Sequence, residues 1–222
     1  MKELYFTKDT IDMEAKKFLT ALHYLRKKKE VVLRPDASAL LVLDMQRYFL
    51  EEDSHAYIPS AKAIIPNIKQ LQEEFLSRDI KVYQTRHINN EENAVQMKTW
   101  WKDSITRDNP YSALIDDLYD KRAETLNKIQ YDAFYCTGLE RRLVGGGIKQ
   151  VVITGVMTHL CCESTARSAF VRGCEVFFVV DGTAAYNREF HQASLLNLSH
   201  GFATPVLARE IVEALAGKPN ES

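Results

Sequence analysis

The sequence predicts an α/β fold in which a largely parallel β-sheet carries helices on both faces. Two observations support this prediction. Short runs of consecutive apolar residues, typical of strands buried on both faces, recur along the chain and alternate with longer helix-like segments. Such an alternation joins neighbouring strands through right-handed βαβ crossovers, and these crossovers build a parallel sheet.

The domain organisation is predicted to be simple. The 222 residues contain no internal repeat and no linker rich in proline, glycine or serine. We therefore expect a single domain over residues 1–222, with residues 1–36 forming a helical extension ahead of the first strand. A chain of this length can bury a sizeable hydrophobic core.

The first half of the chain begins with a predicted amphipathic helix over residues 9–30, whose apolar positions share one face: Ile11, Phe18, Leu22 and Leu25. The sequence Arg34-Pro35-Asp36 ends this pattern, since proline interrupts a helix. The following segments are predicted in order: a strand over 39–43, a helix over 61–79 with Pro66 near its start, a strand over 80–85, an irregular polar stretch over 86–109 and a helix over 111–120.

The second half repeats the alternation of helix and strand. Its predicted segments are a helix over 139–147 that ends at its glycines, a strand over 149–154, a helix from Cys161 to Gly173, a strand over 176–180, a helix over 188–200, a strand over 202–206 and a closing segment over 208–217.

Charge and composition argue against several classes of partner. The 29 basic and 30 acidic residues nearly balance, so neither nucleic acid nor an anionic membrane is expected as a partner. No apolar run approaches the ~20 residues that span a bilayer, and the N-terminus lacks the apolar core of a signal peptide. The four cysteines show neither disulfide-framework nor zinc-site spacing, which favours a reduced, cytoplasmic location.

Candidate reactive residues follow the predicted strands. Asp44 ends the first strand, Arg86 and His87 follow the second, and Cys161 follows the strand over 149–154. Reactive side chains of open parallel sheets gather beyond the carboxyl ends of the strands. Lys128, between two apolar patches, completes a predicted cluster of carboxylate, ammonium and thiol.

Each of these residues also has an ordinary structural interpretation. An aspartate after a strand is often a helix cap or a turn former, a buried cysteine is often a small apolar residue, and a lone lysine is usually solvated. In favour of chemistry, a cysteine at the start of a helix lies near backbone N–H donors and the positive end of the helix dipole, which favour the thiolate.

Three segments resemble a known family. The segments are LLVLDMQRYFL (40–50), NKIQYDAFYCTGLERRLVGGGIKQVVITGV (127–156) and GVMTHLCCESTARSAFVRGCEVFFVVDGTAA (155–185). They are similar, in this order, to the motifs of the isochorismatase-like hydrolase superfamily, which includes nicotinamidases, N-carbamoylsarcosine amidohydrolases and isochorismatases. The resemblance implies a Rossmann-like, three-layer α-β-α domain with a mostly parallel six-stranded sheet. The helical N-terminal extension resembles the isochorismatase branch.

The resemblance also implies a catalytic set and a mechanism. By position, Asp44, Lys128 and Cys161 match the family's Asp-Lys-Cys triad, and a cis peptide would join Val156 to Met157. Asp44 would take the thiol proton while Lys128 keeps Asp44 ionised. The backbone N–H groups of Met157 and Cys161 would hold the oxyanion, each contributing about 3–4 kcal/mol. No cofactor is expected.

The sequence departs from two branches of the family. Isochorismatases usually lack a cysteine at the position of Cys161, because vinyl-ether hydrolysis needs an acid rather than a nucleophile. Nicotinamidases usually carry an Asp-x-His pair of metal ligands where this chain has His87 and Asn89, so no metal is predicted and nicotinamide is less favoured as substrate. Asp53-x-His55 has a similar spacing but lies too early in the chain. Cys162 should point about 100° away from Cys161 and pack in the core.

These inferences leave three hypotheses for function. The first is hydrolysis of a C–N bond in a small amide or carbamoyl compound through a cysteine thioester, the second is isochorismate pyruvate-hydrolysis with Asp44 as the acid, and the third is a binding protein without turnover. A small molecule is the expected partner, and the family implies a homo-oligomer, a dimer or tetramer. The pocket is predicted to include Arg86, His87, Trp100, Trp101, Tyr131, Phe134 and His159.

Overall fold

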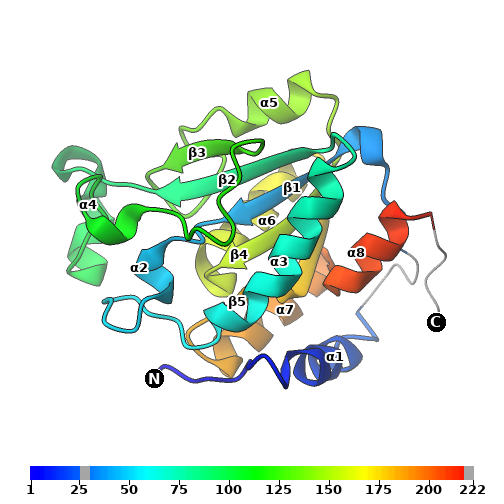
Figure 1. Ribbon diagram of the computed structural model, residues 1–222, viewed down its shortest axis with the longest axis horizontal. Coiled ribbons are helices and arrows are strands. Elements are labelled where there is room, and N and C mark those ends of the chain that lie inside the picture. Colours follow the sequence, from blue (N-terminus) through cyan, green and yellow to red (C-terminus); the bar gives the residue numbers. More distant parts are fainter. Residues whose placement is uncertain (26–30, 218–222) are drawn as a thin grey trace.

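The computed structural model describes residues 1–25 and 31–217, and its centre is a six-stranded sheet (Figure 1). The strands are β1 (Ser38–Leu43), β2 (Lys81–His87), β3 (Glu124–Lys128), β4 (Gln150–Val156), β5 (Glu175–Ala184) and β6 (Thr204–Val206). They lie in the order β3-β2-β1-β4-β5-β6, and each neighbouring pair of these described strands is parallel. The predicted α/β fold with a parallel sheet is confirmed.

Helices cover both faces of the sheet and complete the three layers (Figure 1). They are α1 (Ile11–Ala21), α2 (Arg47–Leu50), α3 (Ala61–Leu76), α4 (Glu91–Trp101), α5 (Leu139–Gly145), α6 (Glu163–Val171), α7 (Arg188–Gly201) and α8 (Ala208–Leu215). Helices α3 and α8 pack together on one face, and α6 and α7 pack together on the other. Every residue of β1 and β4 is buried, as expected for strands whose sequences are mostly apolar.

The sheet grows in opposite directions from its two central strands, β1 and β4. From β1 the chain builds β2 and β3 on one side, and from β4 it builds β5 and β6 on the other. The crevice beyond the carboxyl ends of such a pair of strands is where open α/β sheets bind ligands. Gly155 allows the two strands to approach closely here, because a Cβ at its φ of +109° would lie 2.0 Å from the Leu43 carbonyl oxygen.

Two predictions for residues 86–120 are wrong. The stretch predicted to be irregular contains α4, which starts at a capping box formed by Asn90 and Asn93 and is interrupted at Val95. The helix predicted over 111–120 is replaced by a 3-10 turn, Pro110–Ser112, and further turns. Leu114, Ile115 and Leu118 are nevertheless buried, and the Ile115 N–H donates to the Met45 carbonyl, which ties the segment to the residues that follow β1.

Strand β3 was not among the strands predicted from apolar runs. It is an edge strand whose only buried residues are Leu126 and Lys128, so its sequence ETLNK lacks the continuous apolar pattern of a central strand. Pro66 lies in the second turn of α3 rather than near its first residue. The predicted helices over 139–147, 188–200 and 208–217 correspond to α5, α7 and α8.

The N-terminal residues run along the body of the domain before α1. Tyr5 and Phe6 are buried, and their backbone N–H groups both donate to the Ser60 hydroxyl. Of the helix predicted over 9–30, Ile11–Ala21 forms α1 and residues 22–25 form turns, while residues 26–30, including the lysines at 27–29, lie outside the described residues. No helix in residues 1–25 or 31–217 is long and apolar enough to cross a membrane.

Candidate active site

Asp44 is fixed at the carboxyl end of β1. Its side chain is fully buried and its φ is +51°, an uncommon backbone conformation for a residue other than glycine. The next strand holds it in place, because the Thr85 hydroxyl donates to Asp44 Oδ1 at 2.7 Å and the Asp44 N–H donates to the Thr85 carbonyl at 3.2 Å. These contacts leave Oδ2 facing the remainder of the cluster.

Lys128, the last residue of β3, reaches past β2 to this carboxylate. Its Nζ lies 2.8 Å from Asp44 Oδ2, and both side chains are fully buried. The ammonium also donates to the Gln130 carbonyl at 2.8 Å. Burial alone lowers the pKa of Lys128, but the neighbouring Asp44 and Cys161 outweigh burial and raise it. Lys128 and Asp44 therefore form a buried ion pair.

Cys161 lies in a single π-helical turn, Thr158–Cys162, that joins β4 to α6. The cis peptide expected between Val156 and Met157 is present at the start of this turn. The Cys161 sulfur is 3.3 Å from Lys128 Nζ, so the three residues of the predicted cluster are in contact. Cys162 is fully buried in the hydrophobic core, as expected.

The resting state of Cys161 differs from the expectation of a thiolate. Burial raises the pKa of the Cys161 thiol to about 12, and the Asp44 carboxylate adds to this effect while Lys128 opposes it. Cys161 is therefore a thiol at neutral pH, and it needs a base at the moment of attack. Among the described residues, Asp44 Oδ2 has no hydrogen-bond donor besides the Lys128 ion pair, so it has room to accept the proton.

His87 extends the cluster on the other side of Lys128. Its Nδ1 lies 3.3 Å from Lys128 Nζ and its Nε2 lies 2.6 Å from Asn89 Oδ1. Burial and the Lys128 charge lower the pKa of His87 to about 4. We assign the neutral tautomer in which Nε2–H donates to Asn89 and Nδ1 accepts from Lys128, since this satisfies both nitrogens.

This geometry bears on metal binding. Both ring nitrogens of His87 are already engaged within the protein, and Asn89 donates to the Ile129 carbonyl. Within residues 1–25 and 31–217, no group of three or more histidine, cysteine or acidic side chains is placed to hold a metal ion. The expectation that the protein needs no metal stays a prediction.

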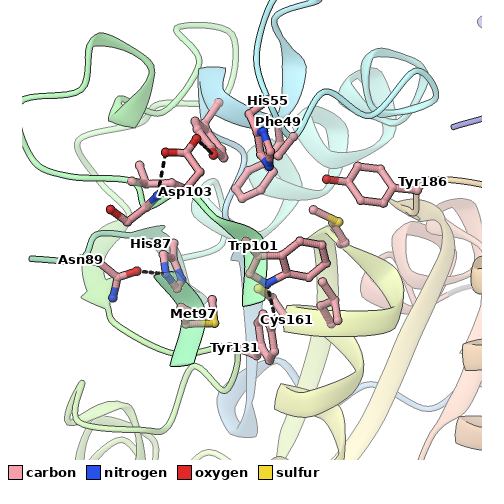
Figure 2. A pocket seen from close by; sticks show the side chains of 16 residues that line it. Phe49, His55, His87, Asn89, Met97, Trp101, Asp103, Tyr131, Cys161 and Tyr186 are labelled. Carbon is pink, nitrogen blue, oxygen red and sulfur yellow. Dashed lines mark hydrogen bonds between the residues drawn. The ribbon is translucent and has the colours of Figure 1, made fainter. Parts of the chain in front are cut away.

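A pocket of about 60 Å³ opens beside Cys161 (Figure 2). Aromatic side chains make up much of its wall, and the Trp101 indole N–H donates to the Tyr131 hydroxyl at 2.7 Å. The residues that line it are Tyr48, Phe49, His55, Ala56, His87, Asn89, Met97, Trp101, Asp103, Ser104, Ile105, Tyr131, Met157, Leu160, Cys161 and Tyr186. The predicted pocket residues His87, Trp101 and Tyr131 are in this set.

The other predicted pocket residues lie elsewhere. Arg86 alternates with His87 along β2, and its guanidinium binds Asn127 outside the pocket. Phe134 is buried beneath the Arg172 guanidinium, 4.7 Å from its ring centroid. Trp100 and His159 line a neighbouring depression instead, where His159 stacks on Phe190.

Most residues of the pocket wall on the side away from Cys161 were not among the predicted pocket residues. Phe49 belongs to the DMQRYFL motif already linked to Asp44, so its proximity to the site was readable from that motif. His55, Asp103 and Tyr186 come from loops distant in sequence, and no local pattern marks them. The position of Tyr186 depends on the N-terminal segment, because the Glu3 N–H donates to the Tyr186 carbonyl at 2.7 Å.

The parallel sheet and the polar cluster at its switch point are those of a hydrolase with a Rossmann-like core. The chain belongs to the isochorismatase family, whose isochorismatase domain model matches residues 38–210. It is 36% identical over 185 residues to Nicotinamidase 3 of Arabidopsis thaliana, covering 81% of this chain and 89% of that protein.

One further relative and one solved structure are also similar to this chain. Enterobactin synthase component B of Escherichia coli (strain K12) is 30% identical over 190 residues, which cover 84% of this chain and 66% of that protein. A cysteine hydrolase from Pseudomonas syringae pv. phaseolicola 1448A has the same fold, with a TM-score of 0.82 and 22% identity over 86% of this chain and 99% of that structure.

Proposed function

We propose that this protein hydrolyses a C–N bond of a small amide or carbamoyl compound through a thioester on Cys161. The observation that carries the proposal is a chain of contacts that begins at the pocket. Cys161 Sγ lies 3.3 Å from Lys128 Nζ, and Lys128 Nζ lies 2.8 Å from Asp44 Oδ2. A thiol, a carboxylate base and a fixed cation form the constellation that nucleophilic catalysis requires.

In the first step the Cys161 thiol gives its proton to Asp44 Oδ2 while its sulfur attacks the substrate carbonyl carbon. Lys128 stabilises the carboxylate before transfer and the developing sulfur anion during it. The carbonyl electrons move onto oxygen, and the backbone N–H groups of Met157 and Cys161 are proposed to hold this oxyanion. The tetrahedral intermediate then collapses, the C–N bond breaks, and Asp44 returns its proton to the leaving nitrogen.

In the second step water cleaves the thioester. Asp44, again a carboxylate, takes a proton from water as its oxygen attacks the acyl carbon. The C–S bond breaks, the proton on Asp44 returns to the Cys161 sulfur, and the carboxylic acid leaves. One water is consumed and one amine or ammonia is released in each cycle.

Isochorismate hydrolysis is the second candidate, supported by the similarity to enterobactin synthase component B and by the DMQRYFL motif. In that reaction Asp44 would protonate the vinyl ether, and Cys161 would have no covalent role. Isochorismate carries two carboxylates, yet none of the residues that line the pocket is a lysine or an arginine. This lining favours the amide substrate.

A two-substrate assay separates the candidates. Ammonia release from small primary amides and pyruvate release from isochorismate are measured for the wild type, Cys161→Ala and Asp44→Asn, with the exposed Cys136→Ala as matched control. We expect ammonia release by the wild type and the control, and its loss in both other variants. Pyruvate release that survives Cys161→Ala but not Asp44→Asn would overturn the proposal in favour of the isochorismatase reaction.

A further inference from the structure

The pocket contains a carboxylate that the proposed chemistry does not use. Asp103 follows α4 and lines the pocket in a part distant from Cys161 (Figure 2). Its Oδ2 accepts from the Tyr48 hydroxyl at 2.6 Å and its Oδ1 accepts from the Ser104 N–H at 2.8 Å. A carboxylate has about four acceptor positions, so both oxygens keep room for a further donor.

The Tyr48 contact holds this carboxylate in place without neutralising it. Tyr48 is buried, and burial followed by the Asp103 contact raises the pKa of its hydroxyl. The hydroxyl therefore stays protonated and donates to Asp103. Within the described part of the chain, Asp103 forms no ion pair with a lysine, arginine or histidine.

Among the described residues, no lysine or arginine lines the pocket, and the two lysines that contact lining residues, Lys128 and Lys2, also bind other groups. Lys128 pairs with Asp44, and His87 is uncharged because its pKa is lowered to about 4. Lys2 donates to the His55 carbonyl at 3.0 Å and lies over the Tyr186 ring, but it is not among the residues that line the pocket. His55, which is exposed to solvent, is the other histidine among the residues that line the pocket.

Aromatic side chains in the pocket wall favour a cationic ligand, as the Asp103 carboxylate does. Phe49, Trp101, Tyr131 and Tyr186 line the same pocket, and aromatic faces attract cations through their quadrupoles. A carboxylate combined with aromatic rings is a recurrent way to bind an ammonium group, whereas an anionic group would meet repulsion from Asp103.

We propose that Asp103 selects substrates that carry a positive charge, such as an ammonium group, at the end away from the bond that is cleaved. This inference rests on the proposed amide hydrolysis and adds the charge class of the substrate to it. Cys161 would attack the carbonyl carbon while the cationic end of the same molecule pairs with Asp103.

Three amides of matched length test the inference: 3-aminopropanamide, which is a cation, butanamide, which is neutral, and succinamate, which is an anion. Wild-type kcat/KM should fall in that order. Asp103→Asn keeps the size of the side chain and an oxygen for Tyr48, but removes the charge. We expect it to lower the ratio of cation to anion kcat/KM by about tenfold or more. Asp108→Asn, an exposed change on the same loop, should leave the ratio unchanged.

Binding measured without turnover separates this inference from the proposed function. The same amides are titrated into Cys161→Ser and into Cys161→Ser/Asp103→Asn by ligand-observed NMR. Tighter binding of the cation that depends on Asp103 supports the inference even if the wild type hydrolyses none of the three. The inference is overturned if neither hydrolysis nor binding favours the cation, or if Asp103→Asn leaves a preference for the cation intact. Either result leaves the proposed function standing.

Discussion

At the scale of single residues, the site depends on one buried ion pair. Asp44 and Lys128 have fully buried side chains, and Lys128 also contacts Cys161 and His87. Removing one partner of a buried pair leaves an uncompensated charge, which is far more costly than losing an exposed contact. The same pair is therefore expected to determine both stability and reactivity.

Lys128→Met should lower the free energy of unfolding by about 3–5 kcal/mol and abolish amide hydrolysis, because Asp44 is left buried and unpaired. Adding Asp44→Asn should restore much of the stability but none of the activity. Urea unfolding followed by circular dichroism measures both effects. Lys62→Met, at an exposed pair with Glu52, is the control and should change stability by less than about 0.5 kcal/mol. Equal losses in Lys128→Met and the control would contradict this description of the pair.

Asp44 and Cys161 were predictable from sequence because each follows an apolar strand of a parallel sheet, whereas Lys128, on the polar edge strand β3, was indicated by the resemblance of its segment to the family motif. The position of Asp103 was not predictable. It depends on the hydrogen bond between Asp103 and Tyr48, residues separated by 55 positions in sequence. Pocket walls of this kind are set by long-range contacts rather than by local pattern.

At the scale of elements, the N-terminal segment is attached to α3 through one hydroxyl. The N–H groups of Tyr5 and Phe6 donate to Ser60 Oγ at 2.9 and 3.0 Å, and both residues are buried. Ser60→Ala leaves these donors without a partner and should lower the free energy of unfolding by about 1–3 kcal/mol. Urea titrations beside the exposed Ser77→Ala control measure the effect. A loss no larger than that of the control would show that water replaces Ser60.

A hydrogen bond between a buried carboxylate and a backbone N–H joins β5 to α8. The buried Asp181 accepts from the Ala208 N–H at the first residue of α8, at 2.8 Å. Burial, partly offset by backbone hydrogen bonds, raises the pKa of Asp181 from 3.8 to about 6. A carboxyl whose pKa is raised by folding contributes stability at low pH and loses that contribution as pH rises through the folded value.

Ionisation of the Asp181 carboxyl should therefore lower the free energy of unfolding by about 1–3 kcal/mol as the pH rises from about 4 to about 7. Asp181→Asn cannot ionise but keeps an oxygen for the Ala208 N–H. The variant should become more stable relative to the wild type as the pH rises across this range. Urea unfolding at several pH values measures the difference, and a difference that does not change with pH would contradict the expected titration.

At the scale of the whole molecule, the fold was predictable from sequence for the elements that are buried along their whole length. Most residues of the central strands β1 and β4 are apolar, so their sequences identify them directly. The edge strand β3 and the helix α4 are polar, and α4 is recognised by its asparagine capping box rather than by apolar periodicity. The 111–120 segment has helical spacing, but its pairing with the end of β1 prevails over that local preference.

The arrangement of the whole fold brings the three residues of the proposed chemistry together. The switch point of the sheet places Asp44 beside Cys161, Lys128 reaches both from the edge strand, and the loops enclose an aromatic pocket around the thiol. The self-association implied by the family stays a prediction.

The most direct test of this account is mass spectrometry of enzyme quenched in acid during butanamide turnover. We predict a butanoyl group on the peptide that contains Cys161, attached to Cys161 rather than Cys162, and a loss of turnover of at least about a thousandfold in Cys161→Ala. Turnover that persists in Cys161→Ala, with no acyl group on the wild-type enzyme, would contradict the account.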